Sequence, residues 1–575
     1  MRASRTAVLP WVTTPVRPEA ASTTFSRSLA HPWAGPTLLA VACFIALFLG
    51  LGGYHLFDPD EGRSAEVARE MVATGQWLVP TINFGQFHDK PALYYWLIAG
   101  SLQLFGTSDF AVRLPGVVAA TCTVIATGVW AANYFGRSTG VLAALILTTT
   151  LGFVGMSRIV LTDATFSCWL VAAFFYGGAW WLDGWRAKWP AWPFYLLIAL
   201  ATLTKGPAAP VLALLVFVPF AWLTSNPLPL RALRLVQGGL ILLVVAGAWY
   251  AAAAVAAPQY IWNFLWNHNV RRYAEGGGGH SANGLTFLYL LPAAYLPWSL
   301  YFPTTVAVLV RSARTGPTAR PIVFCMVWVA AVVGFFSIGG SKLVTYVLPA
   351  FPPLAVLVAS ALSVVASRDV DADVPAWVHQ AILGILCALS VVGAIALLVY
   401  LHQVAPERWI LASCPLAAVV PLGLAIRGVR NGHHSAALAA VAAFTLLDAG
   451  LYYSAVAPAL DDVYSLAEPA RLVRASGDHV AIYTYRTSAY SMEYYAERPT
   501  YEVQTAAEAA ALLSGAAPVV LLTRERHLDA IRRLTTSPSH VWWDGRRARV
   551  LLSNRGAPVA SMRRAQVVNA SQRGW

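Results

Sequence analysis

Long apolar runs recur through most of the chain and limit what it can fold into. Runs of about 20 apolar residues are long enough to cross a bilayer as helices, and about thirteen can be counted. Only 12% of the residues are charged, against about 25% in soluble proteins. The sequence therefore predicts an α-helical, polytopic membrane protein. The expected spans lie at roughly 36–56, 113–135, 138–156, 161–182, 191–204, 208–224, 235–256, 285–310, 321–339, 343–366, 376–402, 409–427 and 434–456.

The positive charges predict how these spans are oriented. If the polar tail 1–35 is cytoplasmic, every inner connection carries Lys or Arg, as the positive-inside rule requires. Inner loops and anionic lipid headgroups then account for the net charge of +13, without a nucleic-acid partner. The inner residues are Arg137, Arg186, Lys188, Arg231, Arg234, Arg311, Arg314, Arg320, Arg368, Arg427 and Arg430.

Three segments outside the spans are long, and all three are expected on the outer, periplasmic face. Loop 57–112 has helical patterns at 60–74 and 91–105, typical of amphipathic helices at the interface. Loop 257–284 contains four consecutive glycines, 276–279, which suit a mobile flap. Residues 457–575 predict a small α/β domain with a disordered end from Ala557. Its expected elements are strands at 479–485 and 518–523, helices at 505–513 and 524–534, and a hairpin at 540–553.

Acidic residues, scarce elsewhere, gather directly after the first span. Asp60 and Glu61 could act as a general base or orient a substrate, or they could cap a helix amino terminus. Asp163 stands where the fourth span begins and has the same two interpretations. Because a carboxylate is costly in lipid, we take Asp60, Glu61 and Asp163 as candidate catalytic residues.

Cations expected on the outer face run against the positive-inside bias and suggest phosphate binding. Lys342 and Tyr346 are four residues apart, so they are expected to share one helix face. Snorkelling to the interface is the alternative interpretation. Asp89 and His268 could also be ligands of a divalent metal ion, the only cofactor considered. The candidate phosphate-binding residues are Lys90, Arg271, Arg272, Lys342, Tyr346, Arg63 and Lys205.

The order of these motifs resembles that of a known family. Asp60-Glu61, Asp89-Lys90-Pro91, Asp163, Lys205-Gly206-Pro207, the His268/Arg272 loop and Lys342…Tyr346 together resemble the polyprenyl-phosphate-dependent membrane glycosyltransferases related to protein O-mannosyltransferases. Within that family the chain looks most like the bacterial aminoarabinose transferases that modify lipid A.

The resemblance implies a GT-C type fold in the bacterial inner membrane and a specific reaction. The donor would be undecaprenyl phosphate carrying 4-amino-4-deoxy-L-arabinose, the acceptor a lipid A phosphate, and the consequence resistance to polymyxin. Transfer of another sugar to another envelope glycan or protein is the first alternative. A transporter or flippase would show internal repeats and midplane charges, which the sequence lacks. A membrane scaffold with an outer sensor domain would not need the outer cations.

Overall fold

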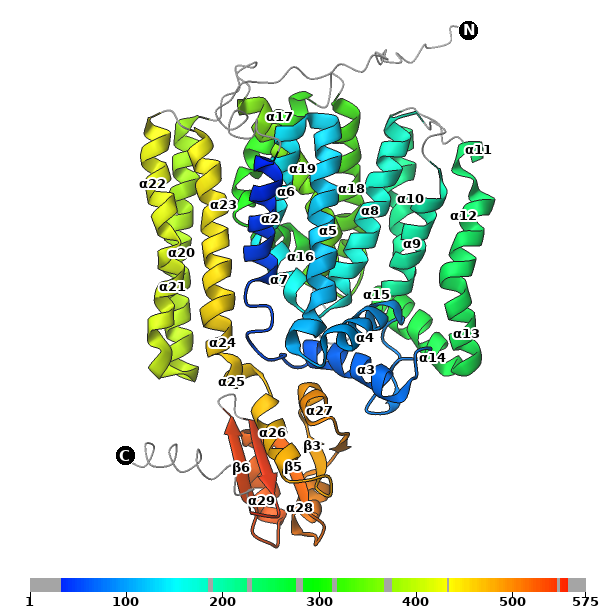
Figure 1. Ribbon diagram of the computed structural model, residues 1–575, viewed down its shortest axis with the longest axis vertical. Helices are drawn as coiled ribbons and strands as arrows, with labels where there is room; N and C mark the ends of the chain where they lie inside the picture. The colour runs from blue at the N-terminus through cyan, green and yellow to red at the C-terminus, as the bar shows by residue number, and fades with distance from the viewer. Residues whose placement is uncertain are drawn as a thin grey trace.

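The computed structural model describes residues 33–184, 190–224, 230–275, 283–312, 318–366, 375–431, 434–545 and 549–556. A bundle of long helices carries a smaller α/β domain at one end (Figure 1). The expectations for most of the tail 1–35, for glycines 276–279 and for the end from Ala557 lie outside the described residues. So do those for Arg186, Lys188, Arg314 and Arg368.

Eight helical segments are long and apolar enough to cross a membrane. Each contains an apolar window of 18 residues with at most two charged residues, which is the pattern that a bilayer core demands. They are α5 (Asp109–Phe135), α8 (Thr162–Leu182), α12–α13 (Leu235–Ala256), α18 (Ala319–Ile338), η5–α19 (Val344–Val364), α20 (Ala376–Val404), η6–α22 (Pro406–Arg430) and α23–α24 (Ser435–Ala459).

Two further spans are broken, and three of the remaining expected spans are short apolar helices. The broken pairs are α6 (Arg137–Thr148) with α7 (Leu151–Arg158), and α16 (Thr286–Ala294) with the segment Trp298–Val310 that includes most of α17. The short helices α2–η1 (Ala34–Phe48), α9 (Trp192–Lys205) and α10 (Ala208–Leu223) run alongside the long ones (Figure 1). All thirteen expected segments are therefore helical, while thirteen crossings of a bilayer stays a prediction.

The two broken spans meet at their breaks. The pairs bend by 60° and 110°. At the meeting point the Leu151 amide donates to the Leu296 carbonyl at 2.9 Å, and the Trp298 indole donates to Thr149 Oγ1 at 2.9 Å. A Cβ on Gly152 would lie 2.4 Å from the Ala294 carbonyl oxygen, so only glycine allows this approach. Each break thus supplies partners for polar groups that the other exposes inside an apolar bundle.

Several short helices lie across the end of the bundle nearest the α/β domain (Figure 1). The predicted helices at 60–74 and 91–105 are confirmed as α3 (Asp60–Thr74) and α4 (Leu93–Phe105). A small hairpin, β1 (Thr81–Ile82) with β2 (Gly85–Gln86), joins them. Three further short helices lie at the same end of the bundle (Figure 1). They are α14 (Pro258–Trp262), η3 (Asn263–Arg271) and α15 (Arg272–Glu275).

The C-terminal domain contains a five-stranded sheet in the order β4-β3-β5-β7-β6. β3 is parallel to β4 and β5, and β7 is antiparallel to both β5 and β6. Val520 and Leu522 of β5 pack on one face of the sheet, and Val519 and Leu521 pack on the other. This two-sided burial explains why the strand reads as a continuous apolar run.

The strands and helices predicted for this domain are present. They are β3 (Ala481–Tyr485), β5 (Val519–Arg524), α28 (Ala506–Ser514), α29 (Leu528–Leu534) and the hairpin of β6 (His540–Gly545) with β7 (Arg549–Ser553). The sequence analysis missed β4 (Thr500–Val503), α26 (Ala467–Ala475) and α27 (Tyr490–Ala496). The last two helices face the bundle.

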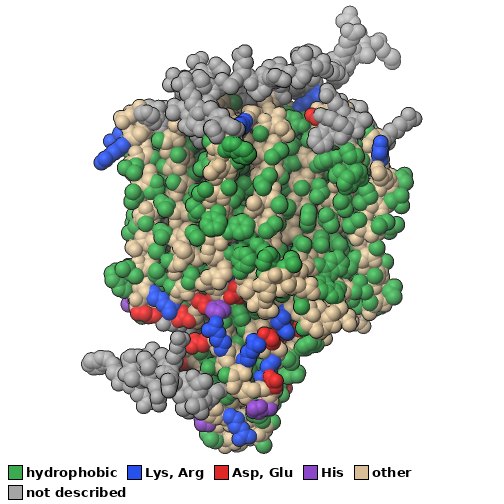
Figure 2. All heavy atoms as spheres, in the orientation of Figure 1, with side chains coloured by type: hydrophobic (Ala, Val, Ile, Leu, Met, Phe, Trp, Pro, Cys, Tyr) green, Lys and Arg blue, Asp and Glu red, His purple; other side chains and the backbone are tan. Residues whose placement is uncertain are grey.

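Charge is distributed as the apolar spans require. Figure 2 shows a bundle flank of hydrophobic and uncharged side chains, with charged side chains gathered toward the C-terminal domain and a few at the opposite end. α5 starts beside the domain, where Asp109 accepts a hydrogen bond from Tyr495 at 2.5 Å, so Arg137 after its last turn lies at the far end. The chain is a multi-pass membrane protein, and the two ends of its helix bundle differ in charge.

Candidate functional site

Asp60 opens helix α3 at the end of the bundle that carries the C-terminal domain. Its side chain is 48% exposed, and Oδ1 accepts a hydrogen bond from Arg63, one turn later, at 2.9 Å. A carboxylate in the first turn of a helix is favoured by the helix dipole. Asp60 is thus held in orientation while remaining accessible.

Glu61, the next residue, points into the protein. Its two carboxylate oxygens accept from the Arg113 guanidinium at 3.0 and 2.8 Å, and the Arg113 side chain is completely buried. Arg113 also donates to the carbonyls of Leu51 and Tyr54. The pair ties α3 to α5 and to the chain before it, so the geometry favours a structural role for Glu61 rather than the expected catalytic one.

Asp89 is the centre of a cluster of cations. Its Oδ1 lies 3.0 Å from Lys90 Nζ, 3.1 Å from His268 Nδ1 and 3.9 Å from an Arg272 nitrogen. Burial favours the neutral carboxyl, but the charge of Lys90 and the hydrogen bond to His268 outweigh it and hold the pKa of Asp89 below its usual range. Arg63 lowers that pKa further, which links the cluster to Asp60.

Asp163 and Lys205 form a second cluster. Asp163 lies in the first turn of α8, and Lys205 ends α9. Lys205 Nζ donates to Asp163 at 2.6 Å and lies 4.5 Å from the centre of the Tyr346 ring. Both charged side chains are largely buried. An ammonium group held between a carboxylate and an aromatic face can turn toward an incoming anion at little cost in conformational entropy.

One segment, residues 258–275, links the two clusters. Tyr260 donates to the Lys90 carbonyl at 2.5 Å, and His268 and Arg272 reach Asp89. The same segment packs on the turn after Lys205. Gly206 has φ +111°, and a Cβ there would lie 2.9 Å from the Phe264 ring. The clusters therefore lie at the same end of the bundle.

Two of the expected phosphate-binding residues are placed differently from the prediction. Lys342 precedes the 3₁₀ helix η5, which starts at Val344, so Lys342 and Tyr346 do not share a helix face and that expectation is wrong. Lys342 Nζ instead donates to the carbonyls of Ser337, at 2.9 Å, and Gly339 at the end of α18, where Gly339-Gly340 stops the helix. Arg271 is exposed on η3, while its neighbour Arg272 lies against Asp89.

Arg113 and Glu70 are buried charges that were not predicted from the sequence. Arg113 is the first residue of an expected span, and an arginine at that place signals a buried partner. Glu66 and Glu70 are buried on α3, and both oxygens of Glu66 bind Arg69, at 2.6 and 2.7 Å. Burial raises the pKa of Glu66 to about 7 despite Arg69. The spacing of four residues between Glu66 and Glu70, which places both carboxylates on one face of α3, was the available signal.

The residues around Asp89 do not fit a divalent metal ion. Among the residues that the structure describes, no group of three or more His, Cys, Asp and Glu side chains could hold one. Lys90 and Arg272 approach the same carboxylate oxygen as His268, so the protein's own cations occupy the surroundings that a metal would need. The donor set favours binding of an anion beside these cations.

Comparison with known proteins finds similarity over part of the chain. Residues 89–262 match the family described as dolichyl-phosphate-mannose-protein mannosyltransferase, a region that includes Asp89, Asp163 and Lys205. The undecaprenyl phosphate-alpha-4-amino-4-deoxy-L-arabinose arabinosyl transferase of Enterobacter sp. (strain 638) is 32% identical over 59% of this chain and 61% of its own length. That of Aeromonas salmonicida (strain A449) is 32% identical over 63% of this chain and 66% of its own length. The chain thus matches less than two thirds of the length of these relatives.

The fold comparison covers more of the molecule. ArnT from Cupriavidus metallidurans bound to undecaprenyl phosphate superposes with a TM-score of 0.76 and 20% identity, over 91% of this chain and 99% of that one. Its apo state gives 0.74. The chain therefore has the GT-C fold of ArnT, as the resemblance implied, and its sequence is similar over more than half its length to proteins named as aminoarabinose transferases.

Proposed function

We propose that the protein transfers 4-amino-4-deoxy-L-arabinose from undecaprenyl phosphate to a phosphate of lipid A. The observation that carries this proposal is the convergence of a half-exposed carboxylate, Asp60, with two clusters of cations at one end of a GT-C bundle. Similarity to relatives named for that donor supports the choice of sugar and carrier. In the reaction the bond between the anomeric carbon and the donor phosphate breaks, an acceptor oxygen bonds to that carbon, and undecaprenyl phosphate leaves.

The cations are assigned to the leaving phosphate. Positive charge that is already in place stabilises the negative charge that grows on the departing oxygen. Lys90 and Arg272 suit this role because Asp89 holds both at one point. Lys205 suits it from the opposite side, with Tyr346 beside it. Arg63 lies between Asp60 and Asp89 and could contact either the phosphate or the sugar.

Asp60 is assigned to the sugar. A lipid A phosphate is already ionised and needs little deprotonation, so a general base is required only if the acceptor is a hydroxyl. With a phosphate acceptor, Asp60 would orient the sugar, through its amine for example, and stabilise the positive charge that develops at the anomeric carbon. Asp163 forms a hydrogen-bonded ion pair with Lys205 and is therefore assigned to positioning that cation.

The charge distribution supports an orientation in the bacterial inner membrane. Arg137 follows the last turn of α5, whose first residue, Asp109, binds Tyr495 of the C-terminal domain. Arg427 and Arg430 end the span Pro406–Arg430, which carries Arg408, the partner of Asp462, near its start. By the positive-inside rule, the end of the bundle that carries these arginines would face the cytoplasm. The cation clusters and the C-terminal domain, at the other end, would face the periplasm. A periplasmic site is where an outer-leaflet lipid A precursor would be available.

Mass spectrometry of lipid A provides the test. Lipid A from cells expressing the protein should carry added aminoarabinose, and cells lacking it should lose that species and become sensitive to polymyxin. Asp60→Asn is the control, since it should behave like the absence of the protein at equal expression. Unmodified lipid A in the presence of the wild-type protein would contradict the proposal and favour another envelope acceptor.

A further inference from the structure

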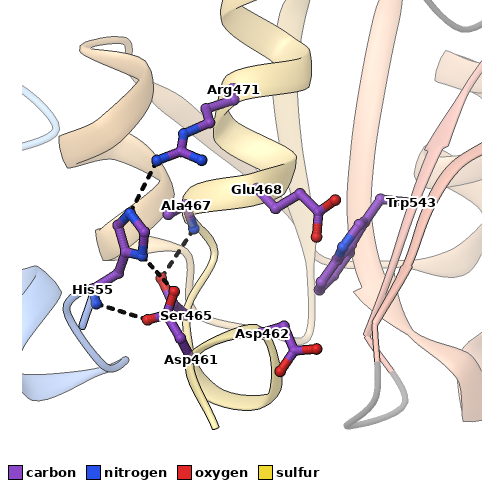
Figure 3. A pocket seen from close by; sticks show the side chains of 8 residues that line it. All are labelled: His55, Asp461, Asp462, Ser465, Ala467, Glu468, Arg471 and Trp543. Atoms are coloured by element: carbon purple, nitrogen blue, oxygen red, sulfur yellow. Dashed lines mark hydrogen bonds and ion pairs between the residues drawn. The ribbon is translucent and has the colours of Figure 1, made fainter. Parts of the chain in front are cut away.

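The C-terminal domain holds the chain that leads into Asp60. We call residues 55–62 the approach segment. At its start, the His55 amide donates to Asp461 at 2.7 Å, and the His55 ring bonds the second oxygen of Asp461. The other ring nitrogen of His55 lies 3.1 Å from Arg471 on α26, as Figure 3 shows. The segment is thus fixed both to the linker before the domain and to the domain itself.

A tyrosine of α27 fixes the next residue. The Tyr495 hydroxyl accepts a hydrogen bond from the Leu56 amide at 2.6 Å and donates to Asp109 at 2.5 Å. Asp109 starts α5, the long helix that also carries Arg113. A single hydroxyl of the C-terminal domain therefore connects the approach segment to the bundle.

The third contact is made by Asp58, two residues before Asp60. One oxygen of Asp58 accepts from the Ser491 amide at 2.8 Å, and the other accepts from the Ser491 hydroxyl. A Cβ on Gly62 would lie 2.4 Å from the Ser491 nitrogen, so α3 and α27 touch without room for a side chain. The first turn of α3 begins directly after Asp58, because the backbone amide of Arg63 donates to the carbonyl of Pro59.

We propose that α27 of the C-terminal domain is a positioning element for Asp60, acting through the hydrogen bonds of Ser491 to Asp58. None of the cations described around Asp89 and Asp163 comes from the described residues of this domain, but the domain fixes the turn from which Asp60 projects. A displacement of about 1 Å at a reacting group can lower a rate by about 100-fold. The proposal rests on the transferase function for its kinetic consequence and on the contacts above for its structural part.

The test compares Ser491→Ala with Ser491→Thr in the full-length protein, reconstituted with the undecaprenyl phosphate donor and lipid A. Ser491→Ala should lower kcat about 10-fold with the KM for donor unchanged, because the phosphate-binding cations are untouched. Ser491→Thr keeps the hydroxyl and should restore most of the rate. Amide hydrogen exchange of residues 57–66 should be faster in Ser491→Ala than in the wild type.

A matched control separates positioning from general loss of stability. Ser553 in β7 donates its hydroxyl to the Val519 carbonyl at 2.7 Å, inside the same domain and away from α3. Ser553→Ala should leave kcat and the exchange of residues 57–66 unchanged. Equal loss of kcat in Ser553→Ala and Ser491→Ala, or failure of Ser491→Thr to recover it, would overturn the proposal.

A double-mutant cycle provides a second test of the proposal. If Asp58→Asn and Ser491→Ala act through one contact, the double variant should lose no more rate than the stronger single variant, whereas additive losses would contradict the coupling. If the wild type transfers no aminoarabinose, the proposed function fails, and the exchange of residues 57–66 then decides alone. Faster exchange in Ser491→Ala would support positioning by α27, and unchanged exchange would overturn it.

Discussion

Asp60 and Glu61 are adjacent in sequence and lie in opposite surroundings. An α-helix turns by about 100° per residue, so one side chain projects toward the cation clusters while the next enters the bundle. Asp60 is half exposed beside Arg63, and Glu61 is enclosed with Arg113. An acid pair that looks like one functional unit is therefore two: an accessible charge and a buried anchor that holds the helix in place.

Removing the anchor should have the largest effect. Glu61→Gln would leave Arg113 buried without its counter-charge, and breaking a buried ion pair costs about 3–5 kcal/mol. We expect a large drop in the thermal unfolding midpoint of the purified protein. Arg474→Gln, which removes an exposed ion pair with Glu497, is the control and should change the midpoint little. Normal stability with lost activity in Glu61→Gln would return Glu61 to the catalytic group.

Asp60→Asn should give the reverse pattern. The variant keeps the size of the side chain and removes the charge, so we expect kcat for sugar transfer to fall by at least about 100-fold. The unfolding midpoint should stay near that of the wild type because the side chain is half exposed. Near-normal transfer would show that the accessible member of the acid pair has no role in the reaction.

The paired arginines allow the same comparison on the phosphate side. Arg272→Gln should raise the KM for the undecaprenyl phosphate donor by about 10-fold, because a charge held at Asp89 is lost. Arg271→Gln, one residue earlier, should have a smaller effect. Steady-state kinetics with varied donor measures the KM of both variants. Equal increases in KM would mean that contact with Asp89 does not make Arg272 more important than Arg271 for donor binding.

A buried carboxyl of the C-terminal domain, Glu493, has no arginine partner among the described residues and should show the smallest effect. Glu493 on α27 accepts a hydrogen bond from the Thr500 hydroxyl, and its other oxygen has no hydrogen-bond partner among the described residues. Burial, opposed in part by Thr500 and helped by the charges of Glu66 and Glu70, raises the pKa of Glu493 to about 8. The neutral carboxyl is therefore the form that suits the folded protein.

The sign of the pH dependence follows from that raised pKa. The contribution of Glu493 to stability is fully present below the pKa of an unfolded glutamate, about 4.5, and is lost as the pH rises through about 8. Glu493→Gln should flatten this dependence and make the protein more stable than the wild type at pH 8. Thermal unfolding between pH 5 and pH 8 is the measurement, and an unchanged slope in the variant would contradict the assignment.

The sequence predicted the helices more completely than the site. Apolar runs of about 20 residues leave few alternatives to a spanning helix, and β5 was recognisable because both of its faces are buried. The separation of Asp60 from Glu61 was not accessible, since Arg113 lies 52 positions away in the chain. Lys342 was misplaced because the start of the span expected at 343–366 was treated as a regular α-helix that includes Lys342, whereas its first turns are a 3₁₀ helix that begins at Val344.

The contact between the two broken spans has a consequence for the engineering of this protein. The Leu151 amide and the Leu296 carbonyl come from distant parts of the chain, and they form a backbone hydrogen bond with each other. A hybrid that takes one break from this chain and the other from a relative would join two surfaces that were not shaped together. Segment exchange between such proteins therefore has to move both breaks as a single unit.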